Sequence, residues 1–154
     1  MSVATRTVTI NAAFLQEIKE DNQRLHELLT HLRGRDARWR LTLSSLADLL
    51  GQLRDQLATH FSLEEAFGYF EDPLRVAPHL CDQAEKLRNQ HGELYSRASD
   101  LAEFADAQSR RSGGDQASGV WERFAAFDAA LQDHEACENE LIMSAFTVDI
   151  GVGD

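Results

Sequence analysis

The sequence predicts an all-α protein, an up-down-up-down antiparallel four-helix bundle. Apolar residues recur at steps of three and four along four separate stretches, the spacing that places side chains on one face of a helix. Only two prolines occur in 154 residues, which suits a helical globule better than a sheet protein. A chain of this length forms one domain with a sizeable core.

Turn residues divide the chain into the four helices. Gly34 ends the first helix, Pro73 ends the second because proline disfavours helix in the preceding residue, and Pro78 suits the first turn of the third. A Gly/Ser-rich loop over 108–119 precedes the fourth. The expected boundaries are an N-terminal arm over 1–10, helices over 11–33, 39–71, 78–107 and 120–146, and a C-terminal tail over 147–154, with 11–146 forming the single domain.

Polar residues interrupt the apolar stripe of every predicted helix. Each stripe contains one His, and the second and fourth add a Glu four residues later, one helical turn along the same face. Burying an unpaired carboxylate costs on the order of several kcal/mol, so a positive group is expected opposite it. The stripes are Leu15-Ile18-Asn22-His26-Leu29, Leu46-Leu50-Leu53-Leu57-His60-Glu64-Phe67, Leu80-Ala84-Leu87-His91-Leu94-Ala98-Leu101-Ala105 and Val120-Phe124-Phe127-Leu131-His134-Glu138-Leu141-Ala145.

These polar residues are candidate metal ligands. Any one of them alone is more often a core or surface residue with its own partner, but cations would satisfy all of them together. Mixed imidazole and carboxylate ligands suit iron or manganese, whereas zinc often takes Cys, and calcium and magnesium prefer oxygen. Two carboxylates can bridge two metals about 3.5–4 Å apart, which leaves room for a solvent-derived bridge and an open position. The predicted ligands are His26, His60, Glu64, His91, His134 and Glu138.

A ferritin-like bundle is the structural alternative, and it requires Glu-x-x-His on two helices. The residues three positions before the four histidines contain no Glu, which disfavours that fold. They are Gln23, Leu57, Arg88 and Leu131.

The ligand pattern resembles the hemerythrin-like HHE cation-binding domain over about 11–146. The resemblance implies a four-helix bundle holding a non-haem di-iron centre that reacts with dioxygen or a related small molecule. Two iron ions, as Fe(II) or Fe(III) with an oxo or hydroxo bridge, are then the expected cofactors, and manganese remains an alternative. The residues that carry it are His26, His60-Phe61-x-x-Glu64-Glu65, His91-x-x-Leu94 and His134-x-x-x-Glu138.

Two positions depart from the oxygen-carrying hemerythrins. Tyr95 stands where their third helix has a second His, and Asn139 stands where their last helix has an Asp, so that Glu138 takes over. The set is closer to bacterial HHE domains, including the di-iron proteins that repair iron–sulfur clusters, whose additional Cys-bearing domain has no room here. Tyr95 either donates a hydrogen bond to a bridging oxygen or bound ligand, or is an ordinary core residue. Glu65 is expected to face solvent or support an imidazole.

Three functions follow, and whether the protein is an enzyme stays open. The first is a binding module that senses, stores or scavenges dioxygen or iron, supported by a compact domain with no second substrate pocket evident. The second is a di-iron oxidoreductase acting on dioxygen, peroxide or nitric oxide, or a protein resembling those that repair iron–sulfur clusters. The third is a helical protein–protein module whose polar core is vestigial, which the complete ligand set disfavours.

Charge and targeting features narrow the partners. The net charge of −11 disfavours nucleic acid and anionic membranes. No signal peptide and no apolar run of about 20 residues is visible, so a cytoplasmic location is expected. Cys81 and Cys137 are too few for a disulfide framework, and each is expected to be a small buried residue.

Overall fold

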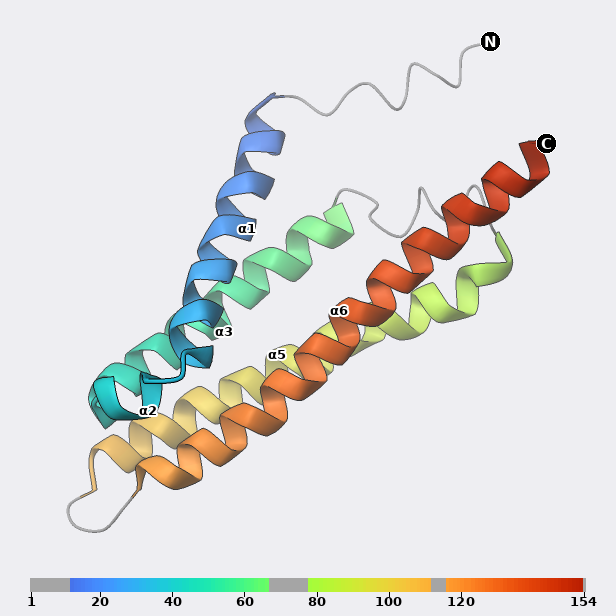
Figure 1. Cartoon of the computed structure of the whole chain (residues 1–154). Helices are drawn as coiled ribbons and strands as arrows, with labels where there is room; N and C mark the ends of the chain where they lie inside the picture. Colours follow the sequence, from blue (N-terminus) through green and yellow to red (C-terminus); the bar gives the residue numbers. More distant parts are fainter. Residues whose placement is uncertain (1–11, 67–77, 112–115, 154) are drawn as a thin grey trace.

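The computed structural model describes residues 12–66, 78–111 and 116–153, and every regular element in these ranges is helical (Figure 1). The prediction of an all-α protein is therefore confirmed. The long helices are α1 (Ala12–Arg33), α3 (Leu43–Ala66), α5 (Cys81–Ser109) and α6 (Ala117–Gly153), with a one-turn helix α2 (Ala37–Arg40) after α1 and a 3-10 turn η2 (Pro78–Leu80) before α5.

The second helix does not begin at residue 39 as expected. The chain makes the short helix α2, becomes extended at Leu41, and starts α3 at Leu43. Thr42 explains the restart, because its Oγ1 accepts a hydrogen bond from the backbone nitrogen of Ser45 at 3.1 Å and so caps α3. The expected end of this helix at residue 71 lies outside the described residues.

The fourth helix is longer than expected at both ends. It begins at Ala117 rather than 120, and it continues to Gly153, through the segment expected to be a tail. No proline occurs in this segment, so nothing removes a backbone donor from the helical ladder. The boundaries expected for the first and third helices lie within about three residues of the observed ones.

The long helices pack in chain order, α1 on α3, α3 on α5 and α5 on α6. Figure 1 shows that α1 diverges from α6 toward its N-terminal end. At its other end, α1 is tied to α6 by an ion pair in which Arg33 Nη2 lies 2.6 Å from Asp128 Oδ1. The seam between α1 and α6 is therefore closed at one end and splayed at the other.

The core has a larger and a smaller apolar cluster, and the predicted ligands lie between them. On α5, His91 lies between Leu87 of the smaller cluster and Leu94 of the larger one. On α6, His134 and Glu138 occupy the same interval. A polar layer is thus enclosed by apolar layers. The smaller cluster consists of Leu80, Ala84, Leu87 and Leu141.

Three of the four predicted stripes face the interior. Every member of the α5 stripe is buried, and so are the described apolar members of the α3 and α6 stripes. The α1 stripe was wrong, because Leu15 is 47% exposed and both Asn22 and His26 are exposed. The inward face of α1 is rotated by about one residue, or roughly 100°. Its buried members are Asp21, Leu25, Leu28, Leu29 and Leu32.

The two cysteines differ in burial. Cys137 is half-buried against the smaller apolar cluster, but Cys81 is exposed, so the expectation of a buried residue was wrong there. None of the described helices has the length and apolar character that crossing a bilayer requires.

Candidate metal centre

Polar side chains from α3, α5 and α6 meet between the two apolar clusters. His91, His134 and Glu138 are all buried, and each offers a ligand atom within 4.8 Å of the others. Glu64 adjoins them, since its Oε2 lies 3.5 Å from Nε2 of His91 and its Oε1 lies 2.5 Å from Nε2 of His60. The structure thus brings five of the six sequence-predicted ligands together.

In each imidazole of the cluster, the Nδ1 atom contacts a side-chain oxygen outside the cluster. An acceptor at Nδ1 keeps the proton on that nitrogen and turns Nε2 the opposite way, the arrangement usual for metal-binding histidines. In all three rings Nε2 faces a carboxylate of Glu64 or Glu138. The outer acceptors are Asp21 Oδ2 at 2.7 Å from His60, Glu65 Oε1 at 3.1 Å from His91 and Gln90 Oε1 at 2.7 Å from His134.

The carboxylates of the cluster keep unused acceptor capacity. Oε2 of Glu64 and Oε2 of Glu138 are buried without a hydrogen-bond partner among the described residues. Nε2 of His134 lies 2.7 Å from Oε1 of Glu138, but not in hydrogen-bonding geometry. Leaving one buried polar atom unsatisfied costs about 1–3 kcal/mol. Converging nitrogen and carboxylate atoms of this kind fit metal cations, which would satisfy them.

The two glutamates share charge unequally. Burial, together with the adjacent negative charge of Glu64, raises the pKa of Glu138 to about 10. Burial also opposes ionisation of Glu64, but its close contacts with the imidazoles of His60 and His91 and with Glu138 outweigh burial and hold the pKa of Glu64 below its ordinary value. Without a metal, Glu64 is therefore the charged member of the pair and Glu138 the neutral one at pH 7.

Two of the histidines also differ in their protonation at pH 7. Burial lowers the pKa of His60, but its hydrogen bonds and attraction to Glu64 and Asp21 outweigh burial and raise that pKa to about 9. Burial and the charge of His91 lower the pKa of His134 to about 4. At pH 7 the metal-free site thus holds a proton on His60 and a neutral ring at His134.

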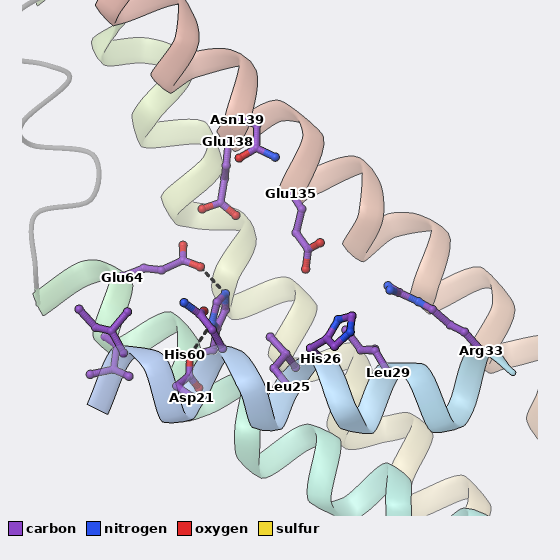
Figure 2. Close-up of a pocket in the computed structure, with 13 residues that line it drawn as sticks. Asp21, Leu25, His26, Leu29, Arg33, His60, Glu64, Glu135, Glu138 and Asn139 are labelled. Atoms are coloured by element: carbon purple, nitrogen blue, oxygen red, sulfur yellow. Dashed lines mark hydrogen bonds and ion pairs between the residues drawn. The ribbon is translucent and has the colours of Figure 1, made fainter. Parts of the chain in front are cut away.

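A cavity of about 370 Å³ opens beside the cluster, lined by α1, α3 and α6 (Figure 2). His60, Glu64 and Glu138 form the part nearest the cluster. Its remaining walls are Ile18, Asp21, Asn22, Leu25, His26, Leu29 and Arg33 from α1, Leu63 from α3, and Glu135 and Asn139 from α6. Burial raises the pKa of the Glu135 carboxyl.

Two sequence-predicted residues lie apart from the cluster. His26 is exposed and lines the cavity on the α1 side, so it faces the site across open space. Tyr95 is 39% exposed on α5 and is not part of the cavity wall. The expectation that Glu65 supports an imidazole is confirmed by its contact with His91.

Sequence reasoning missed two residues that hold imidazoles. Asp21 had a detectable signal, because it lies four residues before Leu25 on the leucine-rich face of α1. Gln90 directly precedes His91 but serves His134 on another helix, a pairing that only the packing of α5 on α6 defines.

Comparison with known proteins agrees with this arrangement. Residues 13–146 match the model of the Hemerythrin HHE cation binding domain. No significant match to a curated protein or to a solved structure accompanies it. The matched range contains the whole cluster of histidines and glutamates, together with the side chains that orient them. The chain therefore belongs to the hemerythrin HHE cation-binding domain family.

Proposed function

We propose that this protein binds two iron ions and uses them to bind or sense dioxygen or a related small molecule, or to handle iron. The observation that supports this best is the common orientation of three imidazoles, each bonded outward through Nδ1 and facing a buried carboxylate through Nε2. Imidazole and carboxylate together suit iron, with manganese as the alternative. The residues that would hold the ions are His60, Glu64, His91, His134 and Glu138, with His26 supplied by α1.

When bound, paired iron ions supply redox chemistry and an open coordination position for a small molecule. The chain itself orients the ligands and limits water. Asp21 fixes the ring of His60, and Gln90 fixes that of His134. The ring of Phe61 stacks on that of His91 with centroids 4.2 Å apart and so covers one face of the cluster. Glu64 and Glu138 supply negative charge opposite the cations.

We infer that α1, α3, α5 and α6 form an up-down-up-down antiparallel bundle around this site, within a domain over 11–146 that is preceded by an arm over 1–10 and followed by a tail over 147–154, into which α6 continues. The sequential packing of the helices supports this arrangement. A cytoplasmic location is part of the proposal, supported by the small number of cysteines, which are both free.

An oxidoreductase is the second candidate. The cavity of about 370 Å³ supports it, since His60, Glu64 and Glu138 form part of its wall and a small reactant can reach them there. Such an enzyme would act on dioxygen, peroxide or nitric oxide, or in iron–sulfur cluster repair, with the cavity giving access to the iron.

Anaerobic loading with Fe(II), followed by cycles of air and argon, tests the assignment and separates the two candidates. We expect about two iron ions per chain. An optical change that reverses under argon supports binding or sensing. Irreversible oxidation that consumes or releases peroxide supports the oxidoreductase. A chain that retains no iron under any loading condition contradicts both.

A further inference from the structure

Glu135 lines the cavity but is not among the predicted ligands. It lies three residues before Glu138 on α6, and this spacing directs both side chains to the same side of the helix. Figure 2 shows its carboxylate reaching from α6 toward α1, on the side of the cavity where His26 lies. Glu135 is half-buried, and no described side chain forms a hydrogen bond or ion pair with it. A half-buried carboxylate thus lines the same cavity as the buried Glu138.

Carboxyl groups outnumber the cationic side chains in the described walls of the cavity, in a chain that is already acidic. Its described walls contain the carboxyl groups of Asp21, Glu64, Glu135 and Glu138. The cationic groups in the same walls are engaged: Arg33 binds Asp128 at 2.6 Å, and His60 lies 2.7 Å from Asp21. Carboxylates in a cleft that are not neutralised by a neighbouring cation concentrate cations there and accelerate their association.

The inner end of the cavity carries an independent sign of a cation. Glu138 is 4% exposed, lines the cavity, and keeps its Oε2 buried without a hydrogen-bond partner among the described residues. Glu64 has the same property on α3. The cavity therefore leads to buried acceptor atoms that have no hydrogen-bond partner among the described residues.

We propose that the cavity between α1 and α6 is the uptake route for the metal cation, and that Glu135 binds the cation transiently before it reaches the buried ligands. This inference rests on the proposed metal-binding function and adds a residue outside the predicted ligand set. Glu135 in this role changes how fast the site fills, and it does not change how many ions the site holds or their final ligands.

Stopped-flow loading of the metal-free chain with Co(II) tests this role, because Co(II) accepts imidazole and carboxylate ligands and is followed by its visible absorption. At low ionic strength, about 20 mM, we expect Glu135→Gln to slow association about fivefold and to weaken its dependence on salt. The final cobalt content and visible spectrum stay those of the wild type. Glu140→Gln is the matched control, since it removes the same charge from an exposed position of α6 outside the cavity, and it loads at the wild-type rate.

Equal loading rates for Glu135→Gln and Glu140→Gln, with wild-type cobalt content in both, overturn the uptake role and leave the metal site standing. Loss of bound cobalt in Glu135→Gln also overturns it, because Glu135 would then be a permanent ligand. A wild-type chain that binds neither Co(II) nor Fe(II) ends the proposed function together with this inference.

Discussion

Oδ2 of Asp21 lies 2.7 Å from Nδ1 of His60, so a buried carboxylate of α1 holds an imidazole of α3 in place. The other oxygen of Asp21 accepts a hydrogen bond from Gln56 at 2.6 Å. Both oxygens of this buried acid are therefore paired, unlike those of Glu64 and Glu138, whose Oε2 atoms have no hydrogen-bond partner among the described residues. The difference separates a group that positions a ligand from groups that are suited to bind metal themselves.

We expect Asp21→Asn to lower metal affinity about 10–100-fold, the usual effect of removing the carboxylate behind a ligand imidazole. The amide retains the size of Asp21 but loses the charge that fixes the tautomer and orientation of His60. Competition with a chromophoric chelator for Co(II) measures the effect. Glu17→Gln, which neutralises an exposed acid of the same helix, is the control and binds as the wild type does. An unchanged affinity in Asp21→Asn would show that this contact does not serve the metal.

The two ions should depend differently on α1. His91, His134 and Glu138 converge without any contribution from α1, whereas His26 lies exposed across the cavity. We therefore expect His26→Ala to reduce the metal content from about two ions per chain to about one, and His134→Ala to lose both. Elemental analysis after desalting measures the content. His31→Ala, an exposed His of α1 outside the cavity, keeps both ions. Two ions in His26→Ala would remove His26 from the ligand set.

Metal ions should compete with protons for the same side chains between pH 6 and 8.5. His60 and Glu138 have pKa values raised to about 9 and about 10, so at pH 7 each carries a proton that a metal must displace. Apparent affinity for Co(II) should therefore rise between pH 6 and 8.5, by up to about tenfold per pH unit for each proton displaced. Chelator competition, corrected for the protonation of the chelator, measures it. An affinity independent of pH in this window would contradict the assignment of these protons.

The same pKa values make the stability of the metal-free protein depend on pH. A His pKa raised from 6.5 to about 9 gives stabilisation that is complete below pH 6.5 and is lost as pH rises toward 9. The raised pKa of Glu138 acts in the same direction above its ordinary value of 4.5. In the presence of a chelator, we expect the free energy of unfolding in urea to fall steadily from pH 6.5 to 8.5. A rise over this range would contradict both shifts.

The sequence was sufficient to predict the helices and most of the site. The stripes have apolar residues at helical spacing, and His and Glu residues interrupt them at the level of the site. On α5, the seven positions of the predicted stripe from Ala84 to Ala105 are all buried, and the single His among them is part of the cluster. On α6, the two polar interruptions at His134 and Glu138 both face inward. A helix packed against its neighbours along its length has one inward face, and its apolar residues identify that face.

For the first helix, the predicted inward face was wrong. Two faces of α1 have helical spacing, one through His26 and one through Asp21, and the spacing alone does not distinguish them. The leucine-rich face is the buried one, and it carries Asp21 into contact with His60. Composition could identify that face, but the partner of Asp21 depends on how α1 packs on α3, which no local pattern specifies.

Metal binding should stabilise the fold measurably, because the metal-free cluster keeps buried acceptor atoms of Glu64 and Glu138 unsatisfied. A ligand that binds only the native state, at a free concentration of about 100 times its Kd, adds about 2.7 kcal/mol to the free energy of unfolding. For a chain of this size we expect Tm to rise by about 5–10 °C on loading with Co(II) and to return on chelation. Thermal unfolding followed by circular dichroism measures the shift. His134→Ala should unfold at the same temperature with and without Co(II). A wild-type protein that holds cobalt at the cluster without any gain in Tm would show that the unsatisfied acceptors are not where the metal binds.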